Sequence, residues 1–429
     1  MSNAVIVSGV RTAVGAFGGS LKDVAAKDLG ALVIRESLIK AGFKPALPAH
    51  AQDDAPDTAK NEGLCPIEQQ YAKWDSHLQE LAVDEVIMGN VIAAGQGQNA
   101  CRQAMIRAGL PKETTAFTIN KVCASGMKAI ALAAASIKAG DNEVVIAGGM
   151  ENMSDVPIGL PKARWGHRMD MPFGKTVDLM VFDALYEIFY GYHMGITAEN
   201  IAARYNISRE EQDKLSVESH TRARNAMKNG LFKDEIVPVI IPQKKGNPVI
   251  FDTDERPMDT SMEKLAKLNT AFKKDGTVTA GNASGINDAA VGMLIMSEEK
   301  AKQMGLKPLA RIKGYASGGV DPAYMGLGPV PAVRKLLRIT GTSIKDYGLF
   351  ELNEAFAAQA ISCLRELNIP WDITNVNGSA ISIGHPVGCS GARIVLALAN
   401  EMKRRNVAMG LASLCIGGGQ GMAIAIEAV

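Results

Sequence analysis

Short apolar runs alternate with longer helical segments along most of the chain, and this pattern predicts an α/β fold. The β-branched run Ala4 to Ser8 predicts a strand, and a segment from about Lys27 to Lys40 predicts a helix. Asp84 to Val91 then predicts a buried strand, followed by a helix over Asn99 to Ala108 that Gly109 ends. Strands that alternate with helices in this way are typical of a sheet built from βαβ units.

The segment Asn120 to Ala139 predicts a helix that is buried on every side. After Cys123 nearly every residue is small or apolar, and Gly140 and Asp141 end the helix. Cys123 therefore stands at the predicted helix start, where unpaired N–H groups and the helix dipole would lower the thiol pKa and favour a nucleophilic thiolate. A structural cysteine is the alternative, because a free cysteine often behaves as a small buried hydrophobic residue.

The same order of elements recurs in the C-terminal part of the chain. Ser390 to Arg393 opens a second Ala- and Leu-rich helix, as Ser125 to Lys128 opens the first. Each helix is followed by a strand that enters glycines, Gly148-Gly149 in the first case and Gly417 to Gly419 in the second. This weak internal duplication predicts two similar α/β halves with their buried helices in the middle, beneath a shared site.

Between the two halves the alternation weakens, from Asp155 to about Gly285. This region contains a charged helix over Ser208 to Gly230 and a β-rich segment over Ile236 to Phe251. We therefore predict an inserted loop domain between the halves. The predicted units are an N-terminal half over residues 1–154 and 286–307, a loop domain over residues 155–285, and a C-terminal half over residues 308–429.

A polar segment, Lys44 to His77, interrupts the N-terminal half. It contains four prolines, at positions 45, 48, 56 and 66, and a cluster of aspartates at positions 53, 54 and 57. We interpret it as a solvated surface insertion with one or two helical turns near Glu68 to Trp74. It is assigned no catalytic role.

Composition limits the class of partner. The chain has 429 residues, with 46 basic and 45 acidic side chains and a formal charge of +1, so it has no overall field that would gather nucleic acid or an anionic membrane. Small molecules or copies of the chain itself are the expected partners. We find no signal peptide and no apolar run long enough to span a bilayer, which favours a cytoplasmic location. The six cysteines lack the close spacing of zinc sites, which favours reduced thiols.

Three reactive side chains occupy glycine-flanked positions in the two halves: Cys123, His385 and Cys415. A thiol beside an imidazole supports nucleophilic acyl transfer, and a second thiol suggests a further proton transfer. The glycines after Cys415 offer backbone N–H groups with no side chain in the way, as an oxyanion hole requires. Taken singly, His385-Pro386 and the triple glycine also have ordinary explanations as tight turns.

Taken together, these segments resemble the thiolase family. The resemblance rests on the ordered motifs N-K-V-C-A-S-G-M, G-G-M-E-N-M-S, N-E-A-F-A, G-H-P-V-G-C-S-G-A-R and C-I-G-G-G-Q-G, and also on Tyr190 to Gly195 and Gly281 to Asp288. It runs from Val5 to the C-terminus and is interrupted mainly by Lys44 to His77. It implies the thiolase fold, a five-layered αβαβα arrangement of two similar halves with a loop domain over the active site.

The resemblance also implies a role for each reactive residue. Cys123 matches the nucleophile that carries the acyl thioester, and His385 matches the histidine that activates it. Cys415 matches the second cysteine, which moves a proton on and off the substrate α-carbon. Asn353 matches the asparagine that holds a water which, with His385, stabilises the enolate oxyanion. The backbone N–H groups of Cys123 and Gly417 match the hole for the tetrahedral intermediate.

Residues of the acyl pocket resemble those of the short-chain members of the family. Ser284 falls where the family contacts the pantetheine arm of coenzyme A, and His193, Met194 and Met325 match residues that narrow the pocket in the acetoacetyl-CoA type. The resemblance therefore implies reversible condensation of two acetyl-CoA molecules to acetoacetyl-CoA and CoA, with no metal or redox cofactor. The segment Pro157 to Phe173 lies where relatives build a tetramer contact, which implies a homotetramer.

Three alternatives stay open. The first is a thiolase for longer 3-ketoacyl-CoA substrates, with the same residues and a wider pocket. The second is a non-catalytic thiolase-like carrier of acyl-CoA or lipid, although such a protein would be expected to lose a catalytic cysteine or the His-Pro turn. The third is a ketoacyl-synthase-type condensing enzyme, which normally has histidine or asparagine where Cys415 stands.

Overall fold

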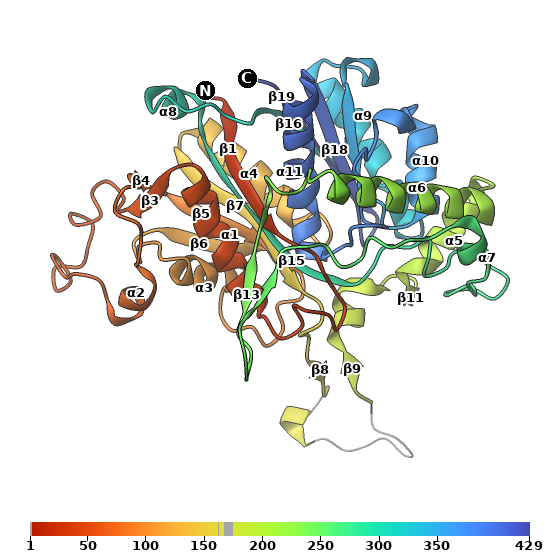
Figure 1. The fold of residues 1–429 in the computed structure, drawn as a ribbon, viewed down its shortest axis with the longest axis horizontal. Coiled ribbons are helices and arrows are strands. Elements are labelled where there is room, and N and C mark those ends of the chain that lie inside the picture. Colours follow the sequence, from red (N-terminus) through yellow and green to blue (C-terminus); the bar gives the residue numbers. More distant parts are fainter. Residues whose placement is uncertain (1, 162, 167–174) are drawn as a thin grey trace.

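A large central sheet organises the molecule (Figure 1). The computed structural model describes residues 2–161, 163–166 and 175–429. The sheet has the order β17-β18-β19-β16-β1-β15-β7-β5-β6, with β12 beside β1 and β2 beside β15. Its strands are β1 (Ala4–Thr12), β2 (Gly15–Ala16), β5 (Glu85–Gly89), β6 (Thr115–Ile119), β7 (Val144–Asn152), β12 (Ile236–Val237), β15 (Asn287–Ser297), β16 (Ala310–Gly319), β17 (Leu349–Leu352), β18 (Met409–Ile416) and β19 (Gln420–Glu427).

The sheet consists of two halves that meet at β1 and β16. These two strands share only the pairs Val5–Arg311 and Ile6–Ala310. On the N-terminal side β6, β5 and β7 run parallel, and β15 is antiparallel to both β7 and β1. On the C-terminal side β17 and β18 run parallel, whereas β19 is antiparallel to β18 and β16. Every residue of β7 and β15 is buried, which explains why these strands read as continuous apolar and small runs.

Helices complete the predicted αβαβα layers. Helices α1 (Ala26–Lys40) and α3 (Ala100–Arg107) share a core cluster with the N-terminal strands, and α9 (Pro329–Thr340) and α10 (Ala357–Leu367) share one with the C-terminal strands. Helices α4 (Ser125–Ala139) and α11 (Val387–Arg405) pack together between the two halves. They approach closely because both carry glycine at the contact: a Cβ on Gly126 would lie 2.8 Å from the backbone nitrogen of Ala392.

One expectation about the central helix was wrong. The stretch Val122–Ala139 is long and apolar enough to cross a membrane by composition, although the sequence analysis found no such run. In the structure, however, α4 is packed against α11 and against strands of the sheet, which is the environment of a core helix. Its apolar composition is explained by burial on several sides within the protein.

The remaining elements lie outside the two halves of the sheet. The short strands are β3 (Phe43–Ala46), β4 (Gln79–Ala82), β8 (Ile158–Gly159), β9 (Val177–Asp178), β10 (Tyr186–Glu187), β11 (Tyr192–His193), β13 (Val239–Ile241) and β14 (Val249–Phe251). The other helices are α2 (Pro66–Tyr71), α5 (Met194–Arg204), α6 (Arg209–Lys228), α7 (Met262–Ala266) and α8 (Glu298–Gln303). Short 3₁₀ or π turns are η1 (Ala163–Trp165), η2 (Val181–Leu185), η3 (Pro322–Leu327), η4 (Ile344–Asp346) and η5 (Trp371–Ile373).

The region predicted as a loop domain is joined to the sheet at the end of β1, a strand in the middle of the sheet. Strand β12 pairs with the end of β1, and the buried guanidinium of Arg11 bonds to Glu235 and Asp254, each at 2.7 Å. The arm formed by β8 and β9 projects away from the body (Figure 1). Part of the predicted tetramer contact, Pro157 to Phe173, lies outside the described residues. The domain boundaries and the tetramer stay predictions.

The insertion Lys44 to His77 is not solvated throughout, which corrects our interpretation. Strand β3, at the start of the insertion, pairs with β4, and α2 overlaps the helical turns predicted near Glu68 to Trp74. Glu68 is 2% exposed, and its carboxylate accepts hydrogen bonds from the backbone N–H groups of Cys65 and Lys112, each at 2.8 Å. The guanidinium of Arg35 lies 3.9 Å from the centre of the Trp74 ring. Both ends of the insertion are therefore anchored to the N-terminal half.

Candidate active site

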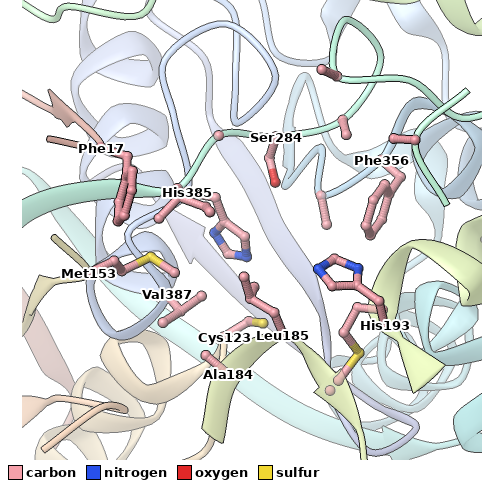
Figure 2. Close-up of a pocket in the computed structure, with 18 of the residues that line it drawn as sticks. Phe17, Cys123, Met153, Ala184, Leu185, His193, Ser284, Phe356, His385 and Val387 are labelled. Atoms are coloured by element: carbon pink, nitrogen blue, oxygen red, sulfur yellow. The ribbon is translucent and has the colours of Figure 1, made fainter. Parts of the chain in front are cut away.

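A cavity of about 440 Å³ brings together most of the residues that the sequence singled out (Figure 2). Eight predicted site residues line it: Cys123, His193, Met194, Ser284, Met325, His385, Cys415 and Gly417. They come from both halves of the molecule and from the loop region, so no single half could form this site. Asn353 is the one predicted residue that does not line the cavity.

Cys123 is presented by a tight turn that precedes α4. Val122 has a φ of 46°, a left-handed conformation that is strained for a β-branched residue. The turn is held by Ser125, whose Oγ accepts the N–H of Lys121 at 2.8 Å and donates to the carbonyl of Val122 at 2.7 Å. Helix α4 starts only at Ser125, so the helix start predicted at Cys123 was two residues too early. The turn directs the thiol into the cavity instead (Figure 2).

The thiol of Cys123 is protonated at rest, contrary to the expectation of a lowered pKa. Burial raises the pKa of Cys123 to about 11, the N–H groups of Gly417 and of Cys123 itself oppose this rise, and the charge of Glu151 adds to it. Because α4 starts after Cys123 and the surrounding protein buries the thiol, the helix dipole does not bring the pKa of Cys123 below its ordinary value. A base is therefore needed to generate the thiolate.

His385 has the geometry of that base. Burial, and to a smaller extent the charge of Arg393, lowers the pKa of His385 to about 4, so the imidazole is neutral. Its Nδ1 lies 2.6 Å from the Oγ of Ser390, and this hydroxyl donates its only proton to the carbonyl of Pro386 at 2.8 Å. We therefore infer that Nδ1 carries the imidazole proton and that Nε2 offers a lone pair. Nε2 is buried and has no partner among the described residues, and Figure 2 shows the ring directed into the space that Cys123 faces.

Cys415 supplies a second neutral thiol. It lies near the end of β18 and is fully buried. Burial and the nearby thiols of Cys123 and Cys363 raise the pKa of Cys415 well above its ordinary value. Such a thiol holds its proton until a strongly basic carbon or sulfur atom reaches it.

Asn353 follows β17, the strand that pairs with β18, and it is fully buried. Neither Oδ1 nor Nδ2 of its side chain has a hydrogen-bond partner in the part of the chain that the structure describes. A buried amide with both ends free has the capacity to hold a water or a polar substrate atom. This agrees with the role that the resemblance implies, although Asn353 is not among the residues that line the cavity.

Comparison with known protein families identifies the fold. A model described as "Thiolase, N-terminal domain" matches residues 4–50 and 72–299, and one described as "Thiolase, C-terminal domain" matches residues 306–428. The chain belongs to the thiolase family. The predicted family and fold are thereby confirmed.

Individual relatives of this thiolase cover its full length. It is 52% identical to the acetyl-CoA acetyltransferase of Syntrophomonas wolfei over 99% of both chains, and 50% identical to that of Cupriavidus necator over 100% of both. The crystal structure of the Bacillus anthracis acetyl-CoA acetyltransferase is 44% identical, with a TM-score of 0.89 over 100% of this chain and 99% of that chain.

The part of the cavity around His193, Met194 and Met325 contains aromatic residues that the sequence did not single out. His193 stacks on Phe272 with ring centres 4.6 Å apart, and Phe356 meets Phe272 edge-on at 6.2 Å. Gly195 makes room for this arrangement, since a Cβ there would lie 2.2 Å from the Phe272 ring. A signal for Phe356 was present, because it belongs to the N-E-A-F-A motif. Phe272 stands in no quoted motif.

His193 is neutral and fixed in orientation. Its Nδ1 accepts the N–H of Gly195 at 3.0 Å, and burial lowers the pKa of His193. The neighbouring side chains of Met194 and Met325 are buried in one cluster with Phe356 and Cys415. Two sulfur-containing side chains and two aromatic rings thus line this part of the cavity. Their assignment to a pocket for a short acyl group stays a prediction. Ser284, at another part of the wall, is held by its N–H bond to the carbonyl of Ala355 at 2.9 Å.

Proposed function

We propose that this thiolase is an acetyl-CoA C-acetyltransferase, which interconverts two acetyl-CoA molecules with acetoacetyl-CoA and CoA through an acetyl group on Cys123. The observation that carries this proposal is the convergence of Cys123, Cys415 and His385 in one cavity. The names of the full-length relatives support the same activity. All three side chains are neutral at rest, which is the correct starting state for cleavage of acetoacetyl-CoA.

Cleavage begins with the transfer of the Cys123 proton to Nε2 of His385. The sulfur attacks the 3-keto carbonyl of acetoacetyl-CoA, and the N–H groups of Cys123 and Gly417 stabilise the resulting oxyanion. Collapse of this intermediate breaks the bond between C2 and C3. The enolate of acetyl-CoA leaves, stabilised by protonated His385 and by Asn353 through a water, and takes a proton from Cys415. Acetyl-Cys123 and acetyl-CoA result.

A CoA thiol then completes the cycle. It gives its proton to the Cys415 thiolate, and its sulfur attacks the acetyl group on Cys123. When the intermediate collapses, the Cys123 sulfur leaves and recovers its proton from His385. Every group returns to its resting state, so the reverse sequence condenses two acetyl-CoA molecules. These steps use side chains and backbone N–H groups of this chain, one water, CoA and its thioesters.

The remaining properties are proposed on separate grounds. The near-zero charge and the scattered cysteines support a cytoplasmic enzyme with reduced thiols. The implied contact over Pro157 to Phe173 supports a homotetramer. We further propose a role in the acyl-CoA exchange of fatty-acid metabolism, with no cofactor beyond the CoA substrates. Sedimentation of the purified chain tests the tetramer.

The test of the activity is direct. The protein is incubated with acetyl-CoA, and its intact mass is measured alongside CoA release and acetoacetyl-CoA cleavage. We expect one acetyl group per chain, located on Cys123 by peptide mapping, and turnover in both directions. A chain that binds acetyl-CoA without acquiring an acetyl group, or without forming acetoacetyl-CoA, would contradict the proposal and favour the carrier.

A further inference from the structure

Glu151 is a fully buried carboxylate that the proposed mechanism does not use. It lies near the end of β7 and is 0% exposed. Burial raises the pKa of Glu151 to about 7, and hydrogen bonds from backbone N–H groups oppose that rise. No lysine or arginine of the described chain lies within salt-bridge distance of it. A buried carboxylate without a cation is costly unless other donors satisfy it.

Four N–H donors satisfy this carboxylate. Oε1 accepts the side-chain amide of Asn90 at 2.8 Å and the backbone N–H of Ile92 at 3.1 Å. Oε2 accepts the backbone N–H groups of Val91 at 2.9 Å and Gly388 at 2.8 Å. Both oxygens therefore act only as acceptors. A glutamine of the same shape would have to place its NH₂ group against one of these pairs of donors.

The four donors belong to two different halves of the molecule. Asn90, Val91 and Ile92 follow β5 in the N-terminal half, whereas Gly388 lies in the first turn of α11 in the C-terminal half. Helix α11 has Pro386 at its N-cap and no side-chain cap of its own. Glu151 thus caps α11 from the opposite half, where a negative charge also complements the helix dipole.

Both catalytic groups lie next to the segments that Glu151 joins. His385 directly precedes the first turn of α11, and its own N–H is held by Oδ1 of Asn287 at 3.0 Å. Val91 and Ile92 form one apolar cluster with Val387, and Cys123 packs against that cluster. A shift of Gly388 relative to Val91 would therefore change the separation of the base from the thiol.

We propose that Glu151 is a positioning residue, which holds the turn of His385 at a fixed distance from Cys123 by joining the β5 exit loop to the first turn of α11. This inference rests on the acetyl transfer proposed above. It predicts two opposite effects when Glu151 becomes glutamine. The loss of a nearby negative charge makes the Cys123 thiol easier to ionise, yet the loss of positioning slows its acetylation.

The experiment compares wild type with Glu151→Gln and Glu151→Asp, all as full-length protein. Acetylation of Cys123 by acetyl-CoA is followed by mass spectrometry, and Cys123 alkylation by iodoacetamide is followed against pH. For Glu151→Gln we expect kcat for acetylation to fall on the order of 100-fold with KM little changed, because a displacement of about 1 Å has that effect. The rise in alkylation above about pH 9, where Cys123 ionises to the free thiolate, should move to lower pH.

Glu151→Asp keeps the charge and both acceptor oxygens but shortens the reach. It should therefore lower kcat while its alkylation profile stays at the wild-type pH, and it carries the test if the glutamine variant does not fold. The matched control is Glu298→Gln. Glu298 is also a mostly buried carboxylate, 7% exposed, but it bonds to Arg311 and Asn3, remote from the cavity lining. Glu298→Gln should change neither the kcat for acetylation nor the alkylation profile.

Two results would overturn the inference. One is acetylation at the wild-type rate by Glu151→Gln or by a folded Glu151→Asp. The other is a loss in Glu151→Gln without any shift of the alkylation profile, which would mean that only stability had changed. If wild type itself takes up no acetyl group, the proposed function fails instead, and this outcome is seen before any variant is measured.

Discussion

The Nδ1 atom of His385 lies 2.6 Å from the Oγ atom of Ser390, in the first turn of α11. Because Ser390 donates its proton to Pro386, this contact fixes the tautomer that leaves Nε2 free as a base. Ser390→Ala should therefore lower kcat on the order of 10- to 100-fold with KM for acetoacetyl-CoA little changed. Steady-state cleavage assays test this. Ser136→Ala removes a comparable hydroxyl, bonded to the carbonyl of Ala133 on α4, and should leave the rate unchanged.

The neutral Cys123–His385 pair predicts an unusual pH profile for thiol alkylation. The pKa of His385 is lowered to about 4, so its base form is present above that pH and is lost below it; the pKa of Cys123 is raised to about 11. Between these values the neutral pair dominates, and because His385 takes the thiol proton as the sulfur attacks, the reactivity of Cys123 towards iodoacetamide should vary little from about pH 6 to about pH 9.

His385→Gln should remove this plateau. Without the base, the alkylation rate must follow the fraction of free thiolate, which rises about tenfold per pH unit below the thiol pKa. Peptide mapping separates Cys123 from the other cysteines. A steep profile in wild type, or a flat one in the variant, would show that His385 does not control the thiol.

The width of the acyl pocket is predicted to depend on Met325. This side chain is 4% exposed and packs in one cluster with Met194 and Phe356. Met325→Ala should raise activity on longer 3-ketoacyl-CoA substrates relative to acetoacetyl-CoA, by a modest factor per carbon because one methylene is worth on the order of 1 kcal/mol. Cleavage rates across a series of chain lengths measure this. An unchanged series would remove the structural basis for a short-chain pocket and favour the longer-chain alternative.

The insertion Lys44 to His77 is predicted to divide into a dispensable middle and an anchored end. Replacing Pro48 to Gly63 with a short turn should leave kcat/KM for acetoacetyl-CoA within a few fold, because this part lies largely exposed and remote from the cavity lining.

Trp74→Ala should lower the free energy of unfolding by about 2 kcal/mol, since it removes the contact with Arg35 and the bond from Nε1 to the carbonyl of Gly109. Denaturant unfolding tests this, with the exposed Leu64→Ala as control.

The apolar pattern of each buried strand and helix predicted an α/β fold of two similar halves, whereas the five layers were implied by the resemblance to the thiolase family. The sequence also predicted the reactive residues, since Cys123, His385 and Cys415 stand in recognisable motifs. The local turn at Val122 was not predictable from hydrophobic pattern: a left-handed valine is an unfavourable conformation that only the surrounding structure enforces. The prediction of a lowered pKa for Cys123 was also wrong, because burial by segments distant in the sequence outweighs the local effect of the helix dipole.

Contacts between distant segments were likewise invisible in the sequence. Glu68 reads as a surface residue in a polar segment, yet it is buried by the backbone of Lys112, 44 positions away. Phe272 has no motif, and its role depends on the absence of a side chain at Gly195. Such pairings are set by tertiary packing and not by local preference.

The two active-site thiols are predicted to have separable roles. The backbone N–H groups of Gly417 and of Cys123 itself lower the pKa of the Cys123 thiol against the effect of burial, which favours its thiolate before attack. Cys415 is fully buried at the end of β18, and its raised pKa suits it to give and take a proton at the substrate α-carbon. Cys123→Ala should abolish both acetyl-enzyme formation and turnover.

Cys415→Ala should still accept an acetyl group from acetyl-CoA but lose most of the condensation rate, together with exchange of the acetyl α-hydrogens with solvent deuterium. Intact-protein mass spectrometry and isotope exchange, applied to wild type and both variants, measure these steps separately. The substitution leaves His385 and its bond to Ser390 unaltered, so the attack by Cys123 retains its base. Acetylation of Cys123→Ala but not of Cys415→Ala would reverse the two roles. Normal exchange and condensation in both variants would show that neither thiol is catalytic, whereas a wild type that neither exchanges nor condenses would favour the thiolase-like carrier.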